Sequence, residues 1–140
     1  MLGLSGFGVL LVGGYLGGHL SYRKGVNVNR TAWEEGPREW TQVLADSELE
    51  DDEHRRVHAD GEPLLLYRRA GQVHALAATC SHMGGPLDEG AIAHGSVTCP
   101  WHGSIFRLSD GSVVRGPASA PQPCYEAKVQ AGRIDVRIAP

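Results

Sequence analysis

The chain has 140 residues, of which 41% are hydrophobic and 21% are charged, and this composition excludes a wholly disordered protein. Its formal net charge of −3 argues against a protein that binds nucleic acid through phosphate contacts, so no nucleic-acid partner is expected. The three cysteines are an odd number, which excludes a disulfide framework in which every cysteine is paired.

The N-terminal segment has the length and composition of a membrane span. Leu2 to Tyr22 carries no formal charge, and as a helix it would be about 31 Å long, close to the thickness of a bilayer core. Arg23 and Lys24 follow directly, and basic residues beside a span favour the cytoplasmic side. We therefore predict a transmembrane helix over residues 1–24 and a membrane-anchored, cytoplasmic remainder. A signal peptide, a flexible glycine-rich tail and a buried soluble helix are alternatives, and a soluble cytoplasmic protein is expected if the segment does not insert.

Small residues in this segment recur at a spacing of four, as in Gly13/Gly17 and Gly14/Gly18. That spacing lets helix backbones approach closely, so we expect partner helices in the membrane. His19 is interpreted as a neutral imidazole that hydrogen-bonds near the interface, with haem ligation as the alternative. Residues 13–30 also resemble the end of an uncharacterised multi-helix membrane domain.

The rest of the chain is predicted to be a connector followed by short strands. Residues 25–39 are rich in glycine, asparagine and proline, as is typical of a connector. Six acidic residues within 46–53 indicate a solvated turn or short helix. Runs of β-forming residues on both sides of an Ala-Gly turn predict two hairpins. The predicted strands are Trp40–Leu44, Arg55–His58, the hairpin of Pro63–Arg69 with Gln72–Ala77, and the hairpin of Tyr125–Gln130 with Arg133–Ile138.

Residues 80–122 have few long apolar runs and many Gly, Pro, His and Cys residues, so a metal centre is expected to order them. Cys80-Ser-His82 is followed by Cys99-Pro-Trp-His102, and each motif offers one thiolate and one imidazole, which suit iron or zinc. Zinc sites usually pair Cys with Cys and His with His. The mixed pairs instead favour a two-iron cluster in which one iron takes both thiolates and the other both imidazoles, with structural zinc as the alternative.

The motifs Cys80-Ser-His82-Met-Gly-Gly-Pro86-Leu and Cys99-Pro-Trp-His102-Gly-Ser-Ile-Phe106 resemble those of the Rieske iron–sulfur family. The resemblance implies a [2Fe–2S] cofactor and an all-β fold, a Rieske-type antiparallel β-sandwich over residues 40–139 with a small cluster-binding subdomain at about 79–118. It implies that Cys80 and Cys99 bind the inner iron, that His82 and His102 bind the outer iron, that Gly84 and Gly85 bring backbone N–H groups to the cluster sulfurs, and that Pro117 belongs to a loop covering the cluster.

Departures from the family pattern indicate the low-potential, ferredoxin type. High-potential members carry an extra cysteine in each cluster loop, where this chain has Gly85 and Trp101. Ser104 retains a hydroxyl for a bridging sulfide, but Phe106 stands where those members have a tyrosine hydroxyl. Fewer donors to the cluster stabilise the reduced state less, so we expect the low end of the Rieske range of about −150 to +300 mV.

The resemblance implies a one-electron carrier that passes electrons from a reductase or membrane carrier to a protein acceptor and binds no small-molecule substrate. A complete Rieske oxygenase needs a second iron held by two histidines and a carboxylate, and no histidine follows His102. The alternatives are a redox-sensing or regulatory subunit of a membrane complex and the electron-delivering component of an oxygenase system. An electron-transfer partner that docks on residues 46–53 is the alternative to a solvated face there.

The remaining cysteine and histidines are predicted to lie outside the metal site. Cys124 is interpreted as a half-buried strand residue, because both other cysteines serve as ligands in the resemblance. The other histidines show no paired spacing and are expected on the surface or in turns; they are His54, His58, His74 and His94.

Overall fold

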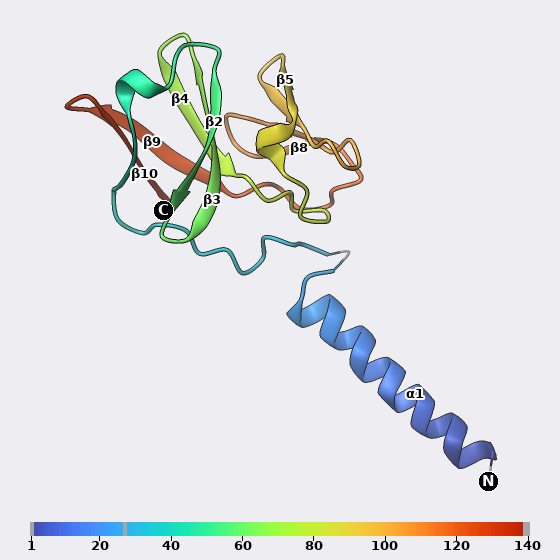
Figure 1. Cartoon of the computed structure of the whole chain (residues 1–140). Helices are drawn as coiled ribbons and strands as arrows, with labels where there is room; N and C mark the ends of the chain where they lie inside the picture. The colour runs from blue at the N-terminus through green and yellow to red at the C-terminus, as the bar shows by residue number, and fades with distance from the viewer. Residues whose placement is uncertain (1, 27, 139–140) are drawn as a thin grey trace.

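The structure is a computed structural model that describes residues 2–26 and 28–138. Met1, Asn27 and Ala139, which belong to the predicted helix, connector and domain, lie outside the described residues. The chain forms one N-terminal helix that extends away from a β-rich body (Figure 1). The predicted all-β fold preceded by one helix is therefore confirmed.

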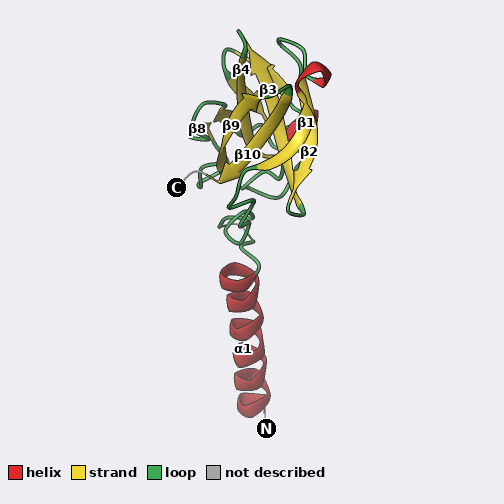
Figure 2. Ribbon diagram, turned by 90° about the vertical axis from the view of Figure 1, so that its left-hand side faces the viewer, coloured by secondary structure: helices red, strands yellow, loops and turns green. Residues whose placement is uncertain are grey.

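The N-terminal helix is α1 (Leu2–Gly18), which continues as one turn of π-helix over His19–Arg23. Over Gly3–Arg23 it has 21 residues and a mean hydropathy of 1.2, and none of it is buried against the protein. By length and composition this helix can cross a membrane, a test that signal sequences and soluble core helices also pass. Side views show that the helix points away from both sheets (Figure 2).

The described residues of the predicted connector, 25–26 and 28–39, form no regular secondary structure, but they are attached to the β-rich body at several points. The Arg30 N–H donates to the Ser81 carbonyl at 2.8 Å, and the Ile138 N–H donates to the Pro37 carbonyl at 2.6 Å. Gly36 has a φ of 57° and packs so closely on Tyr125 that a Cβ there would be 2.3 Å from Cε1 of the ring. Residues 28–37 therefore form a docked segment, a difference from the free connector that composition suggested.

The docked segment buries one carboxyl group, that of Glu34. Burial, together with the nearby charge of Glu62, raises the pKa of Glu34 to about 7, although a hydrogen bond from Thr79 acts in the opposite direction. Glu34 Oε2 and the Tyr125 hydroxyl are both buried without a hydrogen-bond partner among the described residues. The folded protein thus favours the protonated, neutral form of Glu34 at acidic pH.

This carboxyl group makes stability depend on pH. Its folded-state pKa lies above the unfolded value of 4.5, so its stabilising contribution is complete below about pH 4.5 and is lost as pH rises through about 7. Near pH 8 we expect Glu34→Gln to have a free energy of unfolding about 1–2 kcal/mol higher than that of the wild type, after allowance for solvent screening. Near pH 5 we expect the two proteins to be equally stable. Urea unfolding at both pH values measures the difference. Glu35→Gln is the matched control, because Glu35 is exposed and paired only with Arg38. An equal gain at both pH values would contradict this account of Glu34.

The larger sheet has six antiparallel strands in the order β1-β10-β9-β4-β3-β2. Ala70–Gly71 and Ala131–Gly132 have positive φ at both positions, which type I′ hairpin turns require. Both predicted hairpins are therefore present, with small shifts in strand limits. The strands are β1 (Thr41–Ala45), β2 (His54–Ala59), β3 (Glu62–Arg69), β4 (Gln72–Ala77), β9 (Cys124–Gln130) and β10 (Arg133–Ile138).

Trp40 precedes β1 instead of starting the first strand as predicted. Lys128 Nζ lies 4.2 Å and Arg137 Cζ 4.5 Å from the centre of its ring. These cation–π contacts place the indole beside the strands β9 and β10 that carry the two cations.

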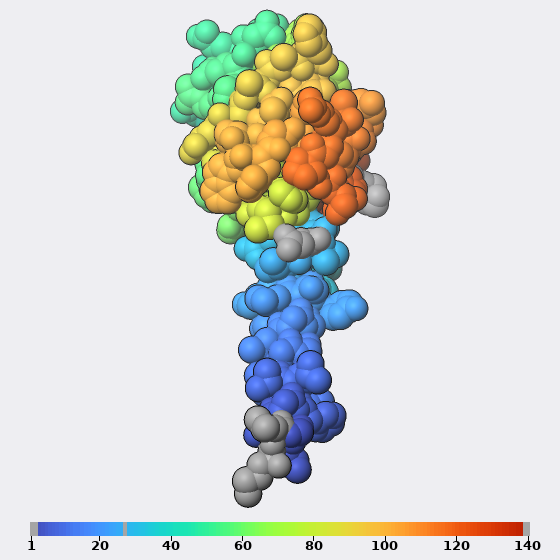
Figure 3. Space-filling view, turned by 90° about the vertical axis from the view of Figure 1, so that its right-hand side faces the viewer, coloured from blue at the N-terminus to red at the C-terminus, as the bar shows by residue number. Residues whose placement is uncertain are grey.

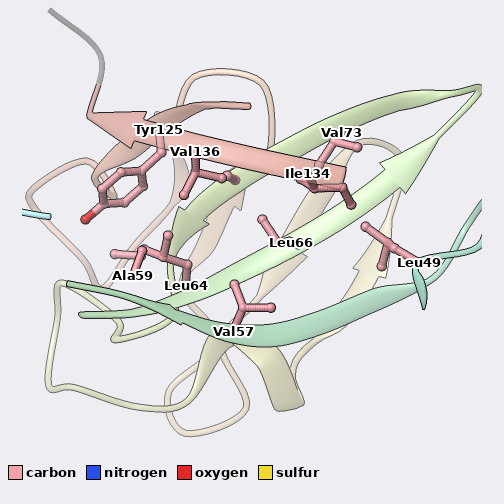
Figure 4. Packing of buried hydrophobic residues seen from close by; sticks show 11 residues of the cluster. Leu49, Val57, Ala59, Leu64, Leu66, Val73, Tyr125, Ile134 and Val136 are labelled. Atoms are coloured by element: carbon pink, nitrogen blue, oxygen red, sulfur yellow. The ribbon is translucent and has the colours of Figure 1, made fainter. Parts of the chain in front are cut away.

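The middle of strand β3, residues 64–67, is buried because it is covered on both faces. Leu64 and Leu66 point into a core formed with β2, β4, β9 and β10, which includes Val57, Ile134 and Val136 (Figure 4). Leu65 and Tyr67 point to the opposite face, into the core shared with the smaller sheet. Alternation of side chains along a strand explains this division.

The smaller sheet has four antiparallel strands in the order β5-β6-β7-β8 and lies beside the larger sheet (Figure 1). Each strand has three residues, too short to give a recognisable alternation, which is why the sequence did not predict them. Its core includes Leu87, which belongs to the short helix Leu87–Glu89, together with Val97 and Phe106. The strands are β5 (Ala91–Ala93), β6 (Ser96–Thr98), β7 (Ile105–Arg107) and β8 (Val113–Arg115).

The acidic segment 46–53 begins with the predicted short helix, Asp46–Glu48, and Leu49 is buried beneath it. Its acids are not all solvated. Asp51 accepts hydrogen bonds from the Ala70 and Gly71 N–H groups at 3.0 and 2.9 Å, and Asp52 accepts one from the Tyr67 hydroxyl at 2.9 Å. Asp46 pairs with Arg68. Much of this negative charge therefore stabilises the β3–β4 hairpin.

Candidate metal centre

Two loops of similar construction carry the predicted ligands. In the first, the Cys80 N–H donates to the Gly85 carbonyl at 2.8 Å and the Gly84 N–H donates to the Cys80 carbonyl at 2.8 Å. In the second, Cys99 pairs with Ser104 and Gly103 in the same way, at 2.8 and 3.0 Å. The first loop follows β4 and the second joins β6 to β7. Figure 3 shows the yellow-green and yellow-orange segments of these loops side by side on one face, close to the docked segment.

Each loop closes at a glycine in the left-handed region, Gly84 with a φ of 79° and Gly103 with a φ of 73°. Gly103 was not among the predicted site residues, although both motifs place a glycine four residues after the cysteine. The N–H of Gly84 donates to the Cys80 carbonyl and closes the loop. Donation by Gly84 to a cluster sulfur, which the resemblance implied, stays a prediction.

The side chains of the four predicted ligands separate into an inner and an outer pair. Cys80 and Cys99 are 1% and 2% exposed, and both belong to the same buried core. His82 is half-buried and His102 is exposed, and their ring centres are 5.0 Å apart with perpendicular planes. Two sulfur donors therefore face the interior, and two imidazoles lie closer to solvent.

Cys80 is buried in a setting that disfavours its thiolate form. Burial raises the pKa of the Cys80 thiol to about 11, although the backbone N–H groups of His82 and Met83 point at its sulfur and lower it. His82 Nδ1 is buried and has no hydrogen-bond partner among the described residues. An iron bound at these atoms would ionise the thiol and satisfy the unpartnered nitrogen.

The donor set fits a two-metal cluster better than a single ion. A structural zinc ion takes four converging ligands, and within residues 2–26 and 28–138 no three His, Cys, Asp or Glu side chains converge on one ion position. In a Rieske cluster each iron needs only two protein ligands, thiolates on one iron and imidazoles on the other. The inner pair and the outer pair match that requirement.

Gly85 packs closely against the Cys99 sulfur and the Trp101 ring, and it leaves no room for a side chain. A Cβ at this position would lie 2.9 Å from Cys99 Sγ and 3.0 Å from Cγ of Trp101. Cys99 cannot move away freely, because its backbone is hydrogen-bonded twice within its loop.

We expect Gly85→Ala to lower the iron and acid-labile sulfide bound per chain and to reduce the melting temperature. Overpacking of this kind costs about 1–3 kcal/mol. Gly116→Ala is the control, because the nearest atom to a Cβ there is 3.6 Å away. A fully loaded Gly85→Ala protein with wild-type stability would show that the contact at Gly85 is not limiting.

Ser104 connects the second loop to the segment that contains Pro117. The Ser104 hydroxyl is fully buried and accepts a hydrogen bond from the Ala118 N–H at 3.0 Å, which leaves its own proton free to be donated. Pro117 is exposed, whereas Ala118 packs in the same core as Cys80 and Cys99. Phe106 is completely buried in that core.

The remaining cysteine and histidines lie away from this centre. Cys124 is half-buried, with its sulfur 3.8 Å from the Ser109 carbonyl, and burial raises its pKa. His54, His58 and His94 are exposed. His74 differs from the prediction because it is half-buried, and burial lowers its pKa.

The family model of the Rieske [2Fe-2S] domain matches residues 39–126. The chain therefore belongs to the Rieske [2Fe–2S] family, and its cofactor is a [2Fe–2S] cluster. The predicted family, fold and cofactor are confirmed, while the ligand assignment and the domain limits stay predictions.

The chain is similar to ferredoxin proteins over most of its length. Ferredoxin CarAc of Metapseudomonas resinovorans is 33% identical over 98 residues, which cover 69% of this chain and 92% of that protein. A chain in the complex of reduced oxygenase and oxidized ferredoxin of carbazole 1,9a-dioxygenase is 31% identical with a TM-score of 0.66, over 72% of this chain and 96% of that chain. Apoptosis-inducing factor 3 of Mus musculus is 32% identical over 90 residues, but these span only 15% of that protein.

Proposed function

We propose that this protein is a one-electron carrier of the ferredoxin type. The observation that carries the proposal is the division of the candidate ligands into buried Cys80 and Cys99 and outward-lying His82 and His102. In this assignment the cysteines bind one iron and the histidines bind the other. When bound, the [2Fe–2S] cluster supplies a one-electron redox couple.

The exposed edge of His102 is the route by which an electron enters or leaves. Trp101 and Met83 lie beside the ligands in sequence and are 57% and 37% exposed, so apolar surface accompanies the imidazoles. Such a surface suits a transient protein–protein contact better than a substrate pocket. The similar solved complex contains an oxygenase and a ferredoxin, which supports an oxygenase as the acceptor for this chain. A reductase is the donor in this proposal.

Membrane anchoring by α1 is a further part of the proposal. The exposed apolar surface of α1 and the basic pair Arg23 and Lys24 at its end support insertion with the metal centre on the cytoplasmic side. The glycines at a spacing of four support partner helices. Partition of the purified full-length chain into phosphatidylcholine vesicles tests this part, and a protein that remains in the aqueous phase would contradict it.

Anaerobic redox titration of the purified protein, followed by electron paramagnetic resonance of the reduced form, tests the carrier function. We expect a reversible one-electron couple near the low end of the Rieske range, about −150 mV, with the resonance signature of a cluster bound by two cysteines and two histidines. A midpoint near about +300 mV would contradict the ferredoxin type. A silent sample that binds zinc would contradict the carrier function altogether.

A further inference from the structure

Ser81 lies between two of the proposed ligands, Cys80 and His82, and is 1% exposed. Its N–H donates to Gln122 Oε1 at 3.0 Å, its hydroxyl donates to the Ala120 carbonyl at 2.8 Å, and its carbonyl accepts from the Arg30 N–H at 2.8 Å. All three polar groups of Ser81 are therefore engaged by segments distant in the sequence.

Gln122 is the only side chain among these three partners, and its amide is fully used. Besides accepting from Ser81, its Nε2 donates to the Ala77 carbonyl at 2.9 Å and to the Thr79 carbonyl at 2.5 Å. Gln122 is 2% exposed, so water does not replace these bonds when they are lost. One buried amide thus connects the end of β4, the residue before Cys80 and the residue after it.

These bonds fix the orientation of the backbone between Cys80 and His82. The Ser81 N–H is turned toward Gln122 Oε1, and the Ser81 hydroxyl is turned toward the Ala120 carbonyl. Hydrogen bonds to cluster sulfurs set the reduction potential, so an amide that directs the backbone of this loop also affects the redox couple.

We propose that Gln122 is a positioning residue of the metal centre, which orients the Cys80–His82 loop through three hydrogen bonds of its side-chain amide. The proposal rests on the ligand assignment given above. The structure supplies the reason for a glutamine here, because the site presents two carbonyl acceptors and one N–H donor, which match the two donors and one acceptor of an amide.

Gln122→Met tests the proposal, because methionine has a similar length and volume but cannot replace these hydrogen bonds. Gln130→Met is the matched control, since Gln130 is exposed at the end of β9. In the folded, full-length variant we expect the cluster to be lost to an iron chelator at least tenfold faster than in the wild type. We also expect broadened resonance lines in the reduced state and a threefold shift of the reduction equilibrium toward the oxidised form, about 28 mV for one electron.

Hydrogen exchange separates loop positioning from general stability. Mass spectrometry with overlapping peptides should find the Ser81 amide slowly exchanging in the wild type and at least tenfold faster in Gln122→Met, with β3 and β10 unchanged. A variant that stays folded with wild-type resonance lines, potential and cluster release would overturn the proposal. If Gln122→Met does not fold, rapid exchange of the Ser81 amide in the wild type overturns it instead. Absence of a Rieske signal in the wild type would mean failure of the proposed function itself.

Discussion

Cys99→Ala is expected to abolish binding of the [2Fe–2S] cluster. The substitution removes one of the two buried sulfur donors, and the neighbouring Cys80 cannot hold the inner iron alone. The region around the site is expected to lose order as well, because Cys80 and Cys99 belong to the same core as Leu87 and Phe106. Visible absorbance together with iron and sulfide content per chain measures the loss.

Cys124→Ala is the control for this experiment within the same chain. Cys124 is a half-buried cysteine, whereas Cys99 is fully buried, and the Cys124 sulfur lies near the Ser109 carbonyl, outside the two ligand loops. We expect this variant to retain full cluster content. Retention of the cluster by Cys99→Ala, or its loss in Cys124→Ala, would require a different set of ligands.

His102→Cys is expected to keep a [2Fe–2S] cluster and to lower its reduction potential by more than about 200 mV. A thiolate adds negative charge to the outer iron, and clusters bound only by cysteine lie near about −400 mV, against about −150 to +300 mV with two histidines. The exposed position of His102 gives the new side chain room to bind without displacing the core. Redox titration and resonance spectra of the two proteins give the comparison.

His58→Cys controls for the introduction of a cysteine. His58 is exposed on β2 and lies outside the ligand loops, so the potential and spectrum should not change. An unchanged potential in His102→Cys would remove His102 from the ligand set, and the proposed route for electrons through its exposed edge would fall with it.

The sequence predicted the larger sheet well because its signals are local. Ala70–Gly71 and Ala131–Gly132 are short turns between β-forming runs, and both hairpins are found there. Strands β5 to β8 have three residues each and are stabilised by Leu87, Val97 and Phe106 packing beneath the ligand loops. No local pattern encodes such strands, because their stability comes from contacts with distant segments.

The four candidate ligands were recognisable from motif spacing, and the structure brings them together. The residues that orient them were not recognisable in the same way. Gln122 lies 41 positions beyond Ser81, and a lone glutamine in a loop carries no signal of its own. Gly103 could have been predicted from the sequence, because it stands four residues after Cys99 just as Gly84 stands four residues after Cys80. The hydrogen bond between Arg30 and Ser81 could not be predicted, because the composition of a segment indicates turns but not which residues those turns contact.

The docked segment 28–37 limits the reach of the redox centre. A free connector of 15 residues would have an end-to-end distance of about 20 Å and would let the domain sweep through a volume of that radius. Contacts at Ser81, Tyr125 and Ile138 remove most of that freedom. In the proposed membrane-anchored state, this docking would keep the metal centre close to the surface into which α1 inserts. A partner anchored in the same surface would reach the side of the domain that carries His82 and His102 by lateral diffusion, without a large reorientation of the domain.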